Sequence, residues 1–202
     1  VRKITLKGAT AVPNYDSASA IDNATICTYG GSEHQYVFLP IMKASDSAII
    51  AQYTWAKAMA EFMGGTLLCL SDREEEDFIY EKMNELAQKT RPDGSTDGIN
   101  SYVNIGYRRQ PETGEFAWDD GGSYIPSATF SYTDKHGYAC LYVFSYYSGG
   151  YTREVRSSEI PAVGYSDNYD RPYIVLELPT VTEDGQTLTE DAIREQLKAF
   201  DK

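Results

Sequence analysis

The feature of this sequence that most restricts its fold is a helical apolar pattern that ends at a glycine pair. Five apolar residues recur at steps of four and three, which predicts a helix with one buried face. They are Ile49, Tyr53, Ala56, Ala60 and Met63. Gly64 and Gly65 follow, where helices commonly end in the left-handed conformation. The apolar run 67–70 comes next and predicts a buried strand, so this helix should pack against a sheet.

A second helix is predicted directly after this run. Ser71 and Glu74 have the spacing of a capping box, in which each side chain bonds the backbone at the other's position. Ile79, Met83 and Leu86 supply a buried face. The acidic first turn favours the positive end of the helix dipole, so these carboxylates have a structural explanation and no metal site is expected there.

The remaining elements predicted from the pattern are strands and hairpins. β-branched and aromatic residues flank turns containing glycine or proline, which indicates two hairpins. The predicted strands are 24–29, 34–39, 102–107, 115–118, 140–144 and 173–178, and a short helix is expected after Thr189. Helices and strands do not alternate as in βαβ folds, so the predicted class is α+β.

Composition and motifs exclude several functions. The formal net charge of -12 argues against nucleic acid and anionic membranes as partners. No apolar run is long enough to insert into a membrane. The three cysteines leave at least one thiol free and lack the C-x-x-C spacing of redox or zinc sites. Common catalytic motifs are absent, and His34 and His136 are isolated, so we expect no enzyme and no cofactor.

Three ordered segments of the chain resemble the C-type-lectin-like family. The first, 53–76, is an aromatic-led helix, a glycine stop, a strand and an acidic second helix. The second combines Val103-Asn104-Ile105-Gly106 with Gly114-Glu115-Phe116-Ala117-Trp118-Asp119-Asp120-Gly121, which is similar to the family's "WIGL" and "GEFKWVDG" patterns. The third is Tyr173-Ile174-Val175-Leu176-Glu177, similar to "FICE". The resemblance covers roughly 34–178.

The resemblance implies a C-type-lectin-like fold with two helices, antiparallel sheets and a long irregular loop region. First and last strands should pair, and ligands should bind projecting loops, here 119–137 and 145–172. The expected organisation is an N-terminal extension (1–23), the domain (24–178) and a tail (179–202) that either docks or links onward. The low cysteine content is similar to bacterial members, so we expect a binding module outside the cell or on a bacterial surface.

The sequence also departs from the family's pattern. The calcium-binding E-P-N or Q-P-D and W-N-D motifs are missing, and Arg153 would place a positive charge near the metal. No usual calcium site is therefore expected, although Glu154, Asp167 and Asp170 leave a nonstandard one open. Positions of one family disulfide hold Ala60 and Leu176, and Cys140 lacks its partner near Ser157, which implies an unpaired core thiol.

The candidate binding residues follow from the 17 tyrosines, several of which fall in a stretch expected to be loop. Tyrosine offers a large rigid contact area with a polar tip, which suits sugar rings and protein surfaces. Packing of the loops onto the body is an alternative for about half of them. A glycan is the expected ligand, with a surface protein bound by an adhesin or scaffold component as the alternative. The predicted ligand-binding residues are Tyr146, Tyr147, Tyr151, Arg153, Glu154, Tyr165, Asp167 and Tyr169, with Trp118, Asp120 and Tyr124 as a second choice.

Overall fold

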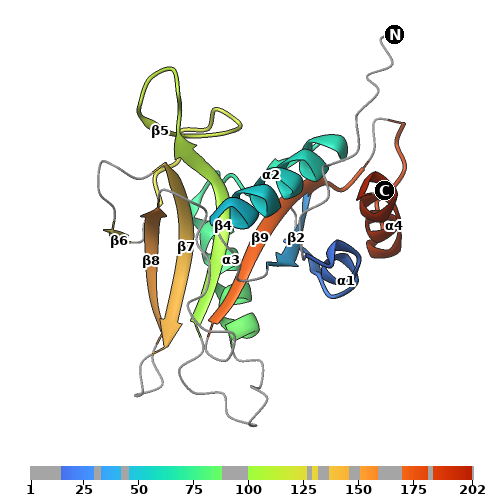
Figure 1. Ribbon diagram of the computed structural model, residues 1–202, viewed down its shortest axis with the longest axis horizontal. Coiled ribbons are helices and arrows are strands. Elements are labelled where there is room, and N and C mark those ends of the chain that lie inside the picture. The colour runs from blue at the N-terminus through green and yellow to red at the C-terminus, as the bar shows by residue number, and fades with distance from the viewer. Residues whose placement is uncertain are drawn as a thin grey trace.

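The fold is built on one mixed sheet covered by helices (Figure 1). The computed structural model describes residues 15–29, 33–41, 46–87, 100–126, 129–131, 137–145, 151–158, 170–181 and 184–201. The helices are α1 (Ser17–Asp22), α2 (Asp46–Phe62), α3 (Arg73–Ala87) and α4 (Glu190–Asp201). The strands are β1 (Thr25–Thr28), β2 (His34–Pro40), β3 (Thr66–Leu67), β4 (Asn100–Arg109), β5 (Phe116–Trp118), β6 (Thr129–Ser131), β7 (Tyr138–Ser145), β8 (Tyr151–Ser158) and β9 (Asp170–Pro179).

The sheet brings strands from both ends of the domain to its centre. In the described part of the chain, the strand order is β1-β2-β9-β4-β7-β8-β6, while β3 pairs with β9 and β5 with β4. β2 and β9 are antiparallel, with Val37 opposite Leu176 and Phe38 opposite Val175. The predicted pairing of first and last strands is therefore confirmed. β9 runs parallel to β4, and β6 parallel to β8, so the sheet is mixed rather than purely antiparallel.

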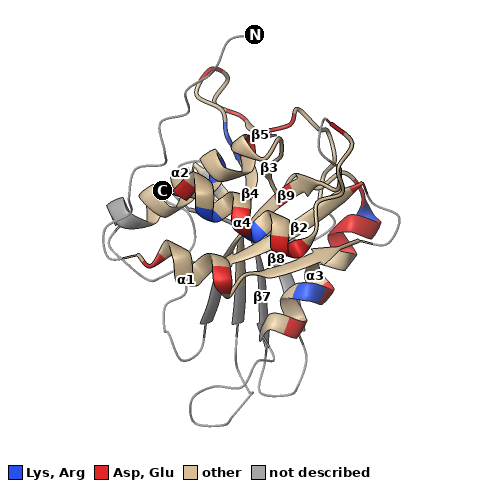
Figure 2. Cartoon of the chain, turned by 90° about the vertical axis from the view of Figure 1, so that its right-hand side faces the viewer, with Lys and Arg blue, Asp and Glu red and all other residues tan. Residues whose placement is uncertain are grey.

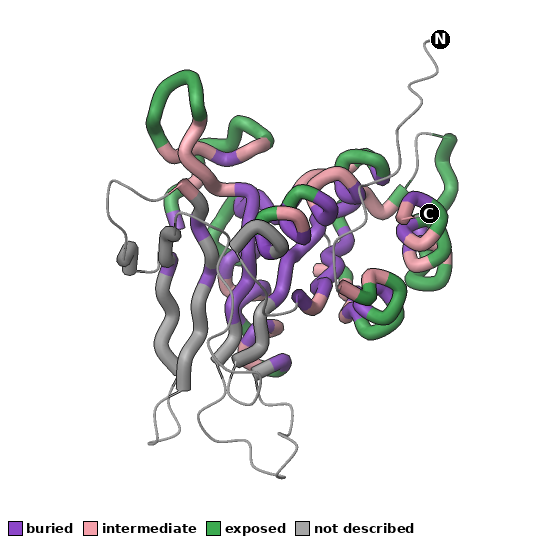
Figure 3. Tube along the Cα trace, in the orientation of Figure 1, coloured by how far each residue is buried: buried purple, intermediate pink, exposed green. Residues whose placement is uncertain are grey.

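The central strands are buried on both faces, because alternate residues point to opposite sides of a strand. Val37, Leu39 and Leu176 belong to a core formed with α1, α2 and α4. Phe38 and Val175 belong to the core under α3. Figure 3 shows buried positions concentrated in these strands and on the inner sides of the helices. Two-sided burial explains why β2 and β9 each contain an uninterrupted apolar run, 36–39 and 173–176.

The glycine pair ends α2 as the sequence predicts. Gly64 has a φ of +79°, which L-residues with a side chain rarely adopt. The N–H of Gly65 donates to the Ala60 carbonyl at 2.8 Å. A Cβ atom on Gly65 would lie 2.1 Å from the Glu177 carbonyl oxygen, so this residue lets the end of α2 approach β9.

The predicted cap of α3 is wrong by one residue. Asp72, rather than Ser71, caps the helix, because its Oδ1 accepts the N–H of Glu75 at 2.8 Å. Glu75, rather than Glu74, reaches back, and its Oε2 accepts the Ser71 N–H at 2.7 Å. Glu74 instead accepts a hydrogen bond from the hydroxyl of Tyr29.

The apolar run 67–70 forms less strand than predicted. β3 ends at Leu67, although Leu68, Cys69 and Leu70 are each at most 1% exposed. Leu68 still donates one hydrogen bond to the Val175 carbonyl. The apolar residues 68–70 are therefore buried as predicted, but the backbone turns toward α3 and does not continue the strand.

Two further helices pack against the body: α4, which matches the short helix predicted after Thr189, and α1, which was not predicted. α4 docks through Ile193, Leu197 and Phe200, which share a core with α2 and β9. Arg194 donates to the carbonyls of Ile21 and Ala24, at the end of α1. The tail therefore docks, whereas the boundaries at 23/24 and 178/179 stay a prediction.

Acidic residues outnumber basic ones in the sequence, 30 to 18. Asp and Glu occur on several helices and loops rather than on one face (Figure 2). None of the helices within the described ranges is long and apolar enough to cross a membrane. The α+β class predicted from the sequence is confirmed by this architecture.

Candidate functional site

Five of the predicted ligand-binding residues lie outside the described residues. These are Tyr146, Tyr147, Tyr165, Asp167 and Tyr169. In the sequence, the first two fall between β7 and β8 and the other three between β8 and β9. Both intervals therefore connect strands of the central sheet.

Three further predicted residues, Tyr151, Arg153 and Glu154, lie in a strand and not in a loop. They belong to β8, which pairs with β7 along eight residues. The expectation of irregular structure throughout 145–172 is thus wrong for 151–158, and also at its two ends, where β7 includes Ser145 and β9 begins at Asp170. The other expected loop, 119–137, contains the short strand β6. Strand positions alternate between faces, so positions 151 and 153 share the face of the buried Val155, and position 154 lies on the other. The three residues do not form one continuous patch.

The strand order also separates two ligands of the nonstandard calcium site left open by the sequence. Glu154 is on β8 and Asp170 on β9, and β7 and β4 lie between them. Three strand spacings of about 4.8 Å amount to roughly 14 Å. The backbones of these two positions therefore lie well apart across the sheet.

The second-choice residues Trp118, Asp120 and Tyr124 lie together but already have structural partners. Trp118 is 3% exposed, and its Nε1 donates to the Tyr124 carbonyl at 2.8 Å. The Tyr124 hydroxyl donates to Glu76 Oε2 at 2.5 Å. Burial, followed by this hydrogen bond, raises the pKa of Tyr124. Asp120 is exposed, and its Oδ1 accepts the Gly122 N–H.

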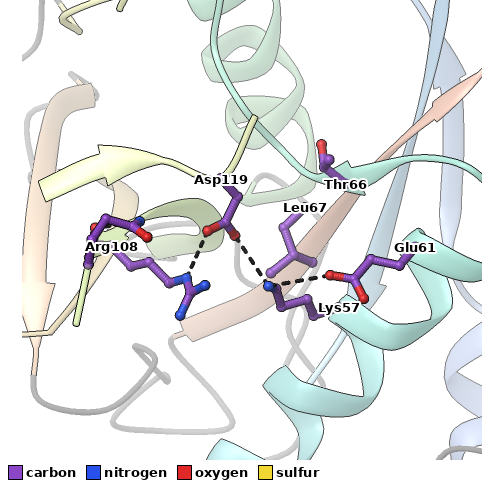
Figure 4. A pocket seen from close by; sticks show the side chains of 7 residues that line it. Lys57, Glu61, Thr66, Leu67, Arg108 and Asp119 are labelled. Carbon is purple, nitrogen blue, oxygen red and sulfur yellow. Dashed lines mark hydrogen bonds and ion pairs between the residues drawn. The ribbon is translucent and has the colours of Figure 1, made fainter. Parts of the chain in front are cut away.

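A polar cleft between α2 and the β4–β5 hairpin was not predicted (Figure 4). It has a volume of about 150 Å³, and Leu67 is its apolar wall. The polar residues that line it are Lys57, Glu61, Thr66, Arg108, Gln110 and Asp119. We call it the α2–β5 cleft.

Opposite charges meet inside this cleft around Asp119, whose side chain is 9% exposed. Arg108 Nε is 2.7 Å from Asp119 Oδ1. Lys57 Nζ is 4.0 Å from Asp119 Oδ2 and 3.4 Å from Glu61 Oε1. Within the described residues, Asp119 Oδ2 accepts no hydrogen bond. The cleft thus contains a shielded carboxylate oxygen beside the Lys57 ammonium group.

The backbone fixes Asp119 at the base of the cleft. Its N–H donates to the Gly106 carbonyl at 2.8 Å, and the preceding Trp118 is anchored in the core. Gly106 is itself tightly packed, since a Cβ there would lie 2.9 Å from Cys69 Sγ. Lys57 and Glu61 are one helical turn apart on α2, which the sequence indicates. Their approach to Asp119 depends on long-range packing, which the sequence pattern does not indicate.

A second group of titratable side chains surrounds the buried Glu177 of β9. Glu177 is 8% exposed; its Oε2 accepts the Cys69 N–H at 2.9 Å, and its Oε1 is 2.7 Å from His34 Nδ1. Burial raises the Glu177 pKa to about 8, and the nearby Glu75 and Asp120 carboxylates act in the same direction.

This group lacks the properties of a nucleophilic site. Burial raises the pKa of the Cys69 thiol to about 12, so the reactive thiolate is scarce near neutral pH. Cys27, also a free thiol, has its pKa raised to about 11 by burial. Among the described side chains, no cluster of three or more His, Cys, Asp or Glu could hold a metal ion.

The Cys140 backbone lies in β7, opposite Arg156 and next to the pair formed by Ala139 and Ser157. Its side chain lies outside the described residues, so its free-thiol state stays a prediction. Ala60 and Leu176, which replace one family disulfide, belong to the same buried core.

The arrangement of these elements is C-type-lectin-like: β2 pairs with the closing β9, α2 and α3 pack on the sheet, and the β4–β5 hairpin carries the Trp118 motif. No protein-family model and no curated protein matches the sequence.

The chain is distantly similar to several solved C-type-lectin structures. The mouse scavenger receptor C-type lectin carbohydrate-recognition domain is 14% identical, covering 81% of this chain and 97% of that one, with a TM-score of 0.44. C-type lectin CEL-I from Cucumaria echinata is 12% identical, covering 71% and 89%, with a TM-score of 0.41. The natural killer cell receptor Ly49C is 17% identical, covering 77% and 92%, with a TM-score of 0.34. The likeness concerns the fold alone.

Proposed function

We propose that this chain is a non-catalytic binding module that recognises a glycan through aromatic residues in the segments around β8. The observation that carries the proposal is the placement of the tyrosine-rich intervals 146–150 and 159–169. Each connects two strands of the buried central sheet. Segments that join rigid strands are where recognition residues commonly occur.

The described scaffold supports this division of roles. Most large apolar residues of β2, β9, α2 and α3 are buried in the two cores, so packing accounts for their presence. In the sequence, Tyr146, Tyr147, Tyr165 and Tyr169 fall between the strands rather than within these elements. Tyrosine rings stack on the apolar faces of sugars while their hydroxyls bond sugar hydroxyls, and this chemistry favours a glycan.

Recognition is proposed to proceed without the family's usual calcium site. The segment Tyr151–Val155 replaces the W-N-D pattern, and Arg153 introduces a positive charge. The strand order separates Glu154 from Asp170, which supports this proposal. We further propose that the module acts outside the cell, attached to a bacterial surface.

A glycan array tests the proposed function with three proteins. Wild type should bind a defined set of glycans, and Tyr147→Ala should lose about thirtyfold in affinity, as expected for an aromatic anchor. Tyr29→Ala is the matched control, because Tyr29 lies beside the first hairpin and contacts Glu74 and Phe78. The control should retain wild-type binding.

Circular dichroism of each variant separates binding from folding. If Tyr147→Ala is folded and binds glycans like wild type, the proposed site is wrong. If Tyr147→Ala unfolds, Tyr147 packs the core and the site is again wrong. Capture of a surface protein that free sugars do not displace would favour a protein-binding adhesin instead.

A further inference from the structure

We propose that the α2–β5 cleft is a second binding site, which takes a neutral, hydroxyl-bearing ligand such as one monosaccharide unit. The cleft is formed by α2, β3 and the β4–β5 hairpin, so it does not depend on the segments around β8. The inference therefore goes beyond the proposed function and can fail separately from it.

The first argument is the unsatisfied acceptor at Asp119. Its side chain is about nine-tenths buried, and Oδ2 accepts no hydrogen bond from any described residue. A buried carboxylate oxygen without a donor is unfavourable, so a donor that reaches it gains more than it would at a solvated oxygen.

The second argument is the distance between this acceptor and the Lys57 ammonium. Figure 4 shows Lys57 Nζ facing Asp119 across the cleft, and the two atoms are 4.0 Å apart. One hydroxyl oxygen can lie about 2.8 Å from both atoms, donating to Asp119 and accepting from Lys57. Lys57 is 27% exposed on a flexible stem, so its side chain can turn to admit the group.

The third argument is the charge balance, which selects among ligand classes. Lys57 and Arg108 are cationic, and Glu61 and Asp119 are anionic, so the charges of the cleft cancel. An anion would bring another negative charge to Asp119, and a cation would be repelled by Lys57 and Arg108. A hydroxyl is both donor and acceptor and matches both partners.

The cleft volume of about 150 Å³ suits a single small unit rather than a long chain. A sugar-sized ligand with few buried contacts should have a dissociation constant in the millimolar range. Such a weak subsite is measured well by NMR titration of the backbone amides.

The test titrates ¹⁵N-labelled protein with methyl glucoside, methyl galactoside and methyl mannoside. At least one should produce saturable shifts at the amides of Lys57, Thr66 and Arg108. Glucuronate and glucosamine, which add a negative and a positive charge, should bind more weakly. Shifts confined to 146–169 would overturn the cleft proposal while supporting the proposed function. Absence of saturable shifts at the cleft with all three glycosides, or tighter binding of a charged sugar there, would also overturn it.

Two variants test the assigned atoms. Lys57→Met keeps the stem and removes the ammonium, and Asp119→Asn replaces the acceptor with an amide. Each should weaken binding by about tenfold or more, because each removes a hydrogen bond to a charged group. Lys82→Met is the control, since Lys82 forms a similar helix ion pair with Glu85 on α3. If Lys57→Met is folded and binds like this control, the proposal is wrong, even if Asp119→Asn does not fold.

Discussion

Replacing Glu177 by Gln should reduce the pH dependence of stability. The Glu177 carboxyl group is buried in β9, where Oε2 accepts the Cys69 N–H and Oε1 lies 2.7 Å from His34 Nδ1. Gln keeps the shape and both contacts: its carbonyl accepts from Cys69, and its amide donates to a neutral His34. Because Gln does not titrate, the variant isolates the proton of Glu177.

The sign follows from the raised pKa of Glu177, which moves from 4.5 to about 8 because burial penalises the carboxylate. Glu75 and Asp120 face the group and act in the same direction. Between these pH values the folded protein holds a proton that the unfolded chain has released. The stabilisation is therefore complete below about pH 4.5 and is lost as pH rises through about 8.

The steepest slope is about 1.4 kcal/mol per pH unit, which over three units sets an upper bound of about 4 kcal/mol. The hydrogen bond from the Cys69 N–H favours the carboxylate and so opposes part of the effect of burial. We therefore expect wild type to lose about 2 kcal/mol relative to Glu177→Gln between about pH 5 and 8.

Urea unfolding followed by circular dichroism across this pH range measures the difference. Glu85→Gln, which alters a carboxylate that is 64% exposed, is the control and should follow wild type. Parallel stability profiles of wild type and Glu177→Gln would refute the reasoning, because Glu177 would then titrate alike in the folded and unfolded chains.

Three other substitutions test how the scaffold is held together, the first two by urea unfolding and the third by hydrogen exchange. Gly65→Ala should destabilise the protein by more than about 1 kcal/mol, because the added Cβ would clash with the Glu177 carbonyl oxygen. Gly137→Ala is its control and should be nearly neutral, because a Cβ at that position has no neighbour within 4 Å. Asp72→Ala should cost about 1 kcal/mol through loss of the α3 cap, and a larger effect of Glu74→Ala would reverse the assignment. Arg194→Met should increase amide hydrogen exchange in α4, because it removes the two hydrogen bonds to the carbonyls of Ile21 and Ala24. Unchanged exchange would show that apolar packing alone holds α4 in place.

Local patterns predicted α2, α3, α4 and the closing strand because burial leaves a clear pattern within each of these segments. Ile49 to Met63 repeats every three to four residues, and Gly64 has the positive φ that ends such a helix. β9 is apolar on both faces because a core lies on each side. These properties are encoded within single segments.

Other features could not be predicted because they depend on neighbours distant in sequence. β8 has no apolar run in its sequence, and Val155 is the one side chain of β8 described as buried. The strand therefore forms through its pairing with β7, which the local pattern does not indicate. Asp119 and Lys57 are far apart in the sequence and meet through the packing of α2 beside the β4–β5 hairpin. The predicted cap of α3 was one residue away from the observed cap, Asp72, because Ser and Asp are both favoured N-cap residues and the pattern does not choose between Ser71 and Asp72.

The most direct test of the central claim is the glycan array repeated with added calcium and with a chelator. Wild type should bind the same glycans with the same affinity in both conditions, and free sugars should displace it. Glycan binding that the chelator abolishes would contradict the proposed calcium-independent recognition, and no glycan binding in either condition would contradict glycan recognition itself.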